Sequence, residues 1–258
     1  MKPMFMDAVR IIEGTKKLMM KTNDEHEMNR NLFIERFRVL RTKIDHLSTE
    51  KGIKKIAITS AIAGEGKTLL STNLSLHLAS GGKKKVLLVE TDLRKPNIAN
   101  LMGIPPSPGL AEYLQNKNKL EDIVYFSKYE GLYIIPAGNT NNSNELLDNV
   151  KFKNLLDSVG DKFNFIIIDT PPVVPAADTM SIKNVIDGVI FVYRLNFTPY
   201  NFLIQAIDEM KGARILGVVL NDVRYSDMGK KYDKYHEYAY AYKDGSSAKK
   251  ENIFIKSQ

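Results

Sequence analysis

Positions 60–68, SAIAGEGKT, combine glycine, lysine and threonine in the spacing of a phosphate-binding loop. An apolar run precedes them and a helical pattern follows, so backbone amides are expected to surround phosphate oxygens at the positive end of a helix. Lys67 can reach the β and γ phosphates of a nucleotide, and the hydroxyl of Thr68 can ligate Mg²⁺. The pattern GxxxxGKT is met except at its first glycine, here Ala61, and a turn without a ligand is the structural alternative. The expected phosphate contacts are Ala63, Gly64, Glu65, Gly66, Lys67, Thr68 and Leu69.

Two apolar runs end in acidic residues that suit a phosphate-bound magnesium ion. FIIID ends in Asp169, whose carboxylate is expected to hold the Mg²⁺ shell from across the loop, unless it only caps the next turn. VLLVE ends in Glu90, with Asp92 two positions later. Residues two apart on a strand point to the same face, so we expect both carboxylates at one site. The expected metal ligands are Thr68, Asp92 and Asp169.

A basic pair follows the second acidic run. Arg94 and Lys95 can balance phosphate charge, although a solvated charged loop explains them nearly as well.

These residues need strands that end at one edge of a sheet. Continuous apolar runs of strand length alternate with helical patterns, which is typical of parallel strands covered on both faces. We therefore predict an α/β fold with a doubly wound, mostly parallel sheet and ligands at the carboxyl ends of its strands. The strands are expected near 55–59, 86–90, 132–136, 165–169, 188–193 and 215–220. Helices are expected near 67–80, 144–158, 178–186 and 200–211.

The chain is long enough for one catalytic domain with appendages, since it has 258 residues. Residues 1–27 are interpreted as an N-terminal arm and 28–224 as the P-loop domain. Within that domain, 28–48 shows apolar residues three and four apart, which predicts an amphipathic helix. Residues 225–258 are interpreted as a flexible tail.

Composition limits the other chemistry. The chain has no cysteine and four scattered histidines, which excludes disulfides and zinc held by cysteine and favours magnesium held by oxygen. No run suits a membrane span or signal peptide, so a cytoplasmic location is expected. The net charge of +7 suits a membrane surface, a nucleic acid or a nucleotide, but a solvated basic surface is as good an interpretation.

The tail carries a cluster of tyrosines. With 12 tyrosines in 258 residues, 11 positions would hold about 0.5 by chance, yet the stretch 232–242 holds several. They are Tyr232, Tyr235, Tyr238, Tyr240 and Tyr242.

A tyrosine hydroxyl, with a pKa of about 10, attacks phosphorus better when a carboxylate accepts its proton. Glu90 or Asp92 is the candidate base, and a solvated terminus is the alternative interpretation of the tail.

In combination, these features resemble the bacterial tyrosine kinases of capsule and exopolysaccharide synthesis, the BY-kinases. The likeness covers about 28–242 and rests on AGEGKT, ETDLRKP, FIIIDTPP, the tyrosine cluster and ERFRVLRT. The last string matches the family's ExxRxxR helix, which packs subunits into a ring and brings one subunit's tail to its neighbour's active site. The resemblance gives this role to Glu35, Arg38 and Arg41, which we interpret as sharing one helix face, with an ordinary charged surface as the alternative.

The resemblance implies a P-loop NTPase fold of the MinD/ParA-like group and a protein-tyrosine kinase that uses ATP and Mg²⁺. Catalysis would rest on Lys67, Glu90, Asp92 and Asp169, and adenine would contact Asn221 in GVVLNDV. It also implies autophosphorylation of the tyrosine cluster in trans, regulation of polysaccharide synthesis and export, and protein tyrosine substrates. The partner would be a membrane-anchored activator of the polysaccharide co-polymerase type, which would hold the kinase at the inner face of the plasma membrane.

The sequence departs from the family pattern at two positions. Glu90 stands where the family has aspartate, which predicts a reduced rate or a rearranged site, and Ala63 stands where proline is common.

Three other functions compete with this interpretation. A ParA/MinD-like switch ATPase would need a lysine early in the loop, where this chain has Ile62, and leaves the tyrosines unexplained. A nucleotide-binding scaffold without transfer would be marked by Glu90, yet Lys67, Thr68 and the two aspartates remain. A nucleic-acid-binding module explains none of the acidic strand ends, so no nucleic-acid partner is expected.

Overall fold

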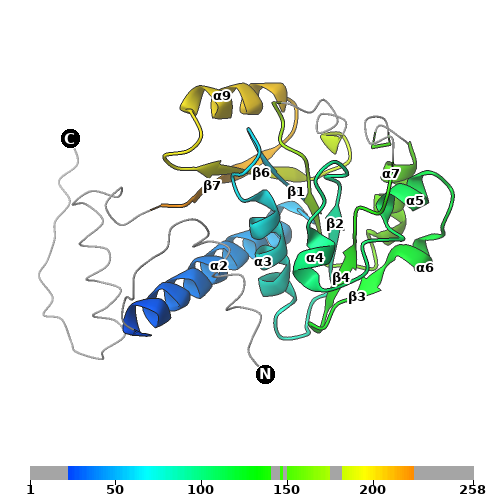
Figure 1. Ribbon diagram of the computed structural model, residues 1–258, viewed down its shortest axis with the longest axis horizontal. Coiled ribbons are helices and arrows are strands. Elements are labelled where there is room, and N and C mark those ends of the chain that lie inside the picture. The colour runs from blue at the N-terminus through cyan, green and yellow to red at the C-terminus, as the bar shows by residue number, and fades with distance from the viewer. Residues whose placement is uncertain (1–22, 141–145, 148–149, 175–181, 224–258) are drawn as a thin grey trace, which may run out of the picture. The chain divides into compact units, whose positions relative to one another are not determined.

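The computed structural model describes residues 23–140, 146–147, 150–174 and 182–223 (Figure 1). The chain divides into two compact units, Met1–Asn221 and Asp222–Gln258, and the sheet belongs to the first. This sheet has seven strands in the order β3-β4-β2-β5-β1-β6-β7. All neighbouring strands pair in parallel except β3 and β4, which are antiparallel. The strands are β1 (Lys55–Ser60), β2 (Val86–Glu90), β3 (Tyr125–Phe126), β4 (Leu132–Ile135), β5 (Phe165–Asp169), β6 (Gly188–Arg194) and β7 (Ile215–Asn221).

The central strands β2 and β5 are apolar up to their last residue because helices cover both of their faces. In β2, Val86 and Leu88 pack into one hydrophobic cluster, whereas Leu87 and Val89 pack into another on the opposite face. The alternation follows from the two-residue period of a strand. It confirms the prediction of a doubly wound sheet.

One face of the sheet is covered by α2 (Asn23–Lys51), α3 (Lys67–Ala79) and α4 (Ile98–Met102), which contribute to the same cluster as Val86. The other face is covered towards β4 by α5 (Leu110–Leu114), α6 (Leu120–Ile123) and α7 (Val150–Val159). Towards β6, α9 (Tyr200–Glu209) covers that face. The helices on both faces therefore hold the P-loop and the ends of the strands in fixed positions.

The predicted elements agree with these bounds with specific exceptions. The helix expected from 28 begins at Asn23, because its polar first turn has no apolar period to signal it, and the predicted arm 1–27 therefore includes helical residues. The short elements α4, α5, α6 and β3 were missed. The helix expected at 178–186 falls partly outside the described residues, as does the start of the one expected at 144–158.

None of the described helices is both long and apolar enough to cross a membrane.

Candidate nucleotide-binding and catalytic site

The P-loop connects the end of β1 to the first residue of α3. Gly66 has φ 99°, and a Cβ there would collide with the side-chain amide of Asn221, so glycine is required. Helix α3 begins at Lys67 with no side-chain cap and no acidic residue in its first turn. Its first amides and the positive end of its dipole therefore suit a phosphate group.

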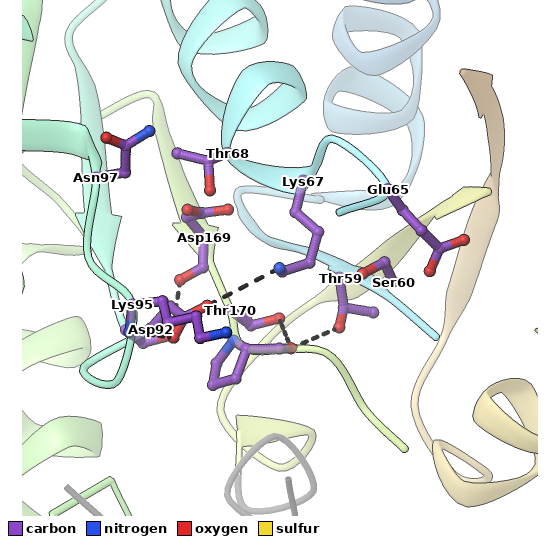
Figure 2. A network of polar contacts seen from close by, with 12 residues as sticks. Thr59, Ser60, Glu65, Lys67, Thr68, Asp92, Lys95, Asn97, Asp169 and Thr170 are labelled. Atoms are coloured by element: carbon purple, nitrogen blue, oxygen red, sulfur yellow. Dashed lines mark hydrogen bonds and ion pairs between the residues drawn. The ribbon is translucent and has the colours of Figure 1, made fainter. Parts of the chain in front are cut away.

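Lys67 and Asp92 meet beneath this loop. Their side chains are 8% and 11% exposed, and Nζ of Lys67 lies 3.9 Å from Oδ2 of Asp92 (Figure 2). The other oxygen, Oδ1, accepts a hydrogen bond of 3.1 Å from the backbone N–H of Lys95. Asp92 thus joins the P-loop lysine to the segment that follows β2.

Asp169 lies at the end of β5 as a buried carboxylate without a hydrogen bond. Neither oxygen makes a hydrogen bond of good geometry among the described residues, and burial raises its pKa to about 7 against the lowering effects of Lys67 and of the nearby hydroxyls of Thr68 and Ser71. Figure 2 shows Thr68 beside this carboxylate. A buried anionic oxygen ligand without a partner, next to a threonine hydroxyl, fits a Mg²⁺ ion that completes its shell with phosphate oxygens and water.

The described residues contain no group of three or more His, Cys, Asp or Glu side chains arranged to hold a metal by themselves. The fit to Mg²⁺ therefore depends on the nucleotide as a co-ligand.

Glu90 has a different environment from the one expected for it. Its Oε1 accepts hydrogen bonds from the backbone N–H groups of Asn97 (2.5 Å) and Ile98 (2.8 Å), and its Oε2 accepts one from Ala137 (3.2 Å). Burial raises the pKa of Glu90. The three backbone hydrogen bonds lower it in part, and the negative charge of Asp92 raises it further. The strand alternation used to place Glu90 and Asp92 on one face does not hold, because β2 ends at Glu90, and both oxygens of Glu90 are occupied by backbone N–H groups.

Glu65 also turns away from the phosphate side of the loop. It is fully buried, and its carboxylate accepts hydrogen bonds from the N–H of Ile62 (2.8 Å), the hydroxyl of Thr198 (2.6 Å) and the N–H of Arg194 (3.3 Å). Its backbone carbonyl accepts one from Nδ2 of Asn221 (2.8 Å). Glu65 therefore ties the P-loop to the ends of β6 and β7.

Two residues of this tie were missed by sequence reasoning. Arg194 donates through Nη1 to the carbonyl of Gly64 at 3.3 Å and lies 4.7 Å from the ring centroid of Phe197, while Thr198 bonds Glu65. No local pattern marks them, since Thr198 and Glu65 are 133 positions apart. The sequence signal that could have pointed to them is the carboxylate of Glu65, because a carboxylate in a phosphate-binding loop needs hydrogen-bond donors.

The predicted oligomerisation residues do not share one exposed face. Arg38 pairs with Glu35 at 3.2 Å with both side chains largely exposed, whereas Arg41 turns inward and donates to the carbonyl of His77 in α3 at 3.3 Å. Positions six apart on a helix are separated by about 120° around its axis, which explains the divergence. The predicted phosphorylation sites, in 232–242, lie outside the described residues.

Comparisons with known proteins place this site in a family. A family model described as an AAA domain matches residues 53–211. Tyrosine-protein kinase YwqD of Bacillus subtilis (strain 168) is 32% identical over 214 residues, which are 82% of this chain and 87% of that protein. The chain belongs to the bacterial tyrosine kinase family. The predicted family is confirmed.

Solved structures agree with this assignment. The kinase domain of Escherichia coli tyrosine kinase ETK matches this kinase with 28% identity and a TM-score of 0.71, over 74% of this chain and 75% of that one. The septum site-determining protein MinD of Pyrococcus horikoshii OT3, complexed with Mg-ADP, matches with 27% identity and a TM-score of 0.58, over 70% of this chain and 76% of that one. The P-loop fold of the MinD/ParA-like group is confirmed.

Family members differ in length. The succinoglycan biosynthesis transport protein ExoP of Rhizobium meliloti (strain 1021) is 29% identical over 210 residues, and they cover 79% of this kinase but 27% of ExoP. The kinase thus corresponds to a part of the longer relatives.

Proposed function

We propose that this chain is a protein-tyrosine kinase that transfers the γ-phosphate of Mg-ATP to tyrosine hydroxyls, including those of its own tail. The observation that carries the proposal is the cluster of Lys67, Asp92 and the unpartnered Asp169 beneath a P-loop. It supplies a cation for the transferred group, a carboxylate near it and oxygen ligands for a metal. The names of the relatives support tyrosine as the acceptor.

The residues present account for the bond that forms, the bond that breaks and the proton that is released. The tyrosine oxygen attacks the γ phosphorus, the bond from that phosphorus to the bridging oxygen breaks, and ADP leaves with the electron pair. Lys67 neutralises charge on the transferred group, and the phenol proton passes to the carboxylate of Asp92. Thr68 and Asp169 would hold Mg²⁺, with Asp92 at the edge of its shell, and the ion would polarise the β and γ phosphates.

Asn221 is the proposed contact to the base. Its Nδ2 donates to the carbonyl of Glu65, which leaves the side-chain oxygen to accept a hydrogen bond from the exocyclic amine of adenine. Guanine presents a carbonyl oxygen at the corresponding position and offers no such donor. ATP is therefore the proposed nucleotide in preference to GTP.

The proposed acceptors are Tyr232, Tyr235, Tyr238, Tyr240 and Tyr242, phosphorylated by another copy of the chain in a ring-shaped homo-oligomer. The relatives include ExoP, named for succinoglycan biosynthesis and transport, which supports a role in regulating polysaccharide synthesis and export. A membrane-anchored activator of the polysaccharide co-polymerase type would then bring the kinase to the inner face of the plasma membrane.

The test is incubation of the purified chain with Mg-ATP, with phosphate mapped by mass spectrometry. Lys67→Met removes the proposed phosphate contact, and Lys83→Met, at an exposed lysine, is the matched control. Phosphate on the tail tyrosines of the wild type and the control, but not of Lys67→Met, is the expected result. Absence of phosphotyrosine from all three, with an activator's cytoplasmic segment included, would contradict the proposal.

The structural likeness to MinD favours one alternative, a switch ATPase that hydrolyses ATP without tyrosine transfer. In the same incubation, release of inorganic phosphate without phosphotyrosine would identify this alternative. The two functions share the P-loop and Asp169, so only the fate of the γ-phosphate separates them.

A further inference from the structure

We infer that Glu90 is a positioning residue that fixes the acceptor side of the active site, and that it does not act as the base. The inference deepens the proposed kinase function and rests on it for its kinetic part. Its structural part concerns three hydrogen bonds and stands apart from any activity.

The carboxylate of Glu90 joins three segments of the chain. Glu90 ends β2 and is 1% exposed. Through Oε1 it accepts from the N–H groups of Asn97 and Ile98 at the start of α4, and through Oε2 from Ala137, just after β4. One side chain therefore connects the end of its own strand to α4 and to the neighbouring strand's exit.

The amides at the start of α4 need such an acceptor from elsewhere in the chain. Helix α4 begins at Ile98, and Asn97, which precedes it, makes no side-chain capping bond. Unpaired N–H groups at a helix start are costly where they are buried, and the bond made by Ile98 is buried. Glu90 satisfies them from the adjacent strand, and an ionised carboxylate is the stronger type of acceptor.

The length of the side chain explains why glutamate occupies this position. Both oxygens are used, and their donors lie on segments 40 positions apart in the chain, residues 97 and 137. An aspartate is shorter by one methylene group, so its carboxylate would lie closer to β2 and farther from both sets of donors. The glutamate is therefore fitted to these bonds.

The clamped segment also carries Asp92 into place. The N–H of Lys95 donates to Oδ1 of Asp92, and Oδ2 of the same carboxylate faces Nζ of Lys67. Figure 2 shows Lys95 next to Asp92, with Asn97 farther along the same segment. Glu90 thus fixes one end of residues 93–98 and Asp92 holds the middle. Lys95, which is exposed, therefore belongs to a segment held by two carboxylates.

A base needs an oxygen directed at the acceptor hydroxyl. Both oxygens of Glu90 accept backbone hydrogen bonds, and so does Oδ1 of Asp92, whereas Oδ2 of Asp92 accepts none from the described residues and faces Nζ of the P-loop lysine at 3.9 Å. The geometry therefore assigns proton acceptance to Asp92 and positioning to Glu90.

The first test is amide hydrogen exchange, resolved by residue, in the nucleotide-free chain. In the wild type, the amides of Asn97, Ile98 and Ala137 are expected to be protected. In Glu90→Gln and Glu90→Asp they should exchange at least roughly tenfold faster, because a buried bond to a charged acceptor is lost. Glu121→Gln, at an exposed glutamate of α6, is the control and should leave them unchanged. Unprotected amides in the wild type would overturn the inference even if neither variant folds.

The second test is kinetic and separates positioning from base chemistry. With a synthetic acceptor peptide of residues 231–242, both Glu90 variants should raise KM for the peptide more than they lower kcat and leave KM for ATP nearly unchanged. Glu90→Asp, which restores the residue typical of the family, should not exceed the wild-type rate. A faster Glu90→Asp enzyme with wild-type amide exchange would show that Glu90 is the base.

The two tests fail separately. A wild type that transfers nothing to tyrosine would contradict the proposed function, while the exchange measurement would still decide whether Glu90 is the clamp.

Discussion

The hydroxyl of Thr198 donates a hydrogen bond of 2.6 Å to the carboxylate of Glu65, across 133 positions of the chain. The bond is fully buried and joins the P-loop to the connection between β6 and α9. It also answers the question of how a loop that binds polyanionic phosphate tolerates a carboxylate. The negative charge is directed away from the ligand and is stabilised by a hydroxyl and two backbone N–H groups.

Replacing Thr198 should therefore weaken ATP binding without touching the nucleotide. Thr198→Val keeps the shape but removes the donor, and a lost hydrogen bond to a buried charged group costs about 1.5–3 kcal/mol. We expect KM for ATP to rise by about tenfold or more in a steady-state assay. Thr198→Ser retains the hydroxyl and should stay close to the wild type. Equal behaviour of the two variants would mean that this bond does not hold the P-loop.

Asp169 should be costly to the fold when no metal is bound. Its burial raises the pKa from 3.8 in the unfolded chain to about 7 in the folded chain. Ionising Asp169 therefore lowers the free energy of unfolding by up to about 4 kcal/mol at pH 8. The cost is full above the folded-state pKa and absent below the unfolded-state value. Asp169→Asn should thus raise the free energy of unfolding of the nucleotide-free protein at pH 8, measured by urea denaturation in EDTA.

The same variant should lose its response to metal. Mg-ATP should stabilise the wild type against thermal unfolding and stabilise Asp169→Asn far less, because an amide is a poor substitute for a carboxylate ligand. Asp161→Asn, at an exposed position, is the control. Equal stabilisation of all three proteins by Mg-ATP would contradict the metal role of Asp169.

The fold was predictable because its main signals are local. Runs such as VLLVE and FIIID are apolar up to their acidic last residue, and this pattern has few explanations other than a strand covered on both faces. The short helices α4 and α5 were missed because each has only five residues, too few to show a helical period.

The positions of Lys67 at the start of α3 and of Asp169 at the end of β5 were predictable, because residue type and place in a motif decide them. The site was not predictable where contacts join distant segments. Glu90 was expected as a candidate base and Glu65 as a phosphate contact of the loop, yet their carboxylates have partners, Ala137 and Thr198, that lie 47 and 133 positions away. Only the register of the sheet and the packed loops bring these donors to them.

Glu112 should make stability depend on acid pH. Burial alone would raise its pKa, but hydrogen bonds from the hydroxyl of Ser107 and the N–H groups of Gly109 and Asn139 give a net lowering. A lowered folded-state pKa contributes stability above the unfolded-state value of 4.5, and that contribution is lost as the pH falls through the folded-state pKa.

Urea denaturation of the wild type and Glu112→Gln at several pH values measures this contribution. The difference in the free energy of unfolding should be largest near pH 7 and shrink below about pH 4. A difference independent of pH would assign the loss to packing instead of charge.

Arg38 and Arg41 should separate assembly from folding. Arg41 donates to the carbonyl of His77 in the last turn of α3, where a cation stabilises the carbonyl end of the helix dipole. Arg41→Ala should therefore lower the thermal stability of the chain at concentrations where it is monomeric.

The side chain of Arg38 is 65% exposed and its ion pair with Glu35 is worth at most about 1 kcal/mol, so Arg38→Ala should leave that stability nearly unchanged. If the helix packs subunits together, Arg38→Ala should instead shift the mass distribution in sedimentation velocity towards the monomer. A drop in monomer stability for Arg38→Ala that matches the drop for Arg41→Ala would contradict this division of roles along one helix.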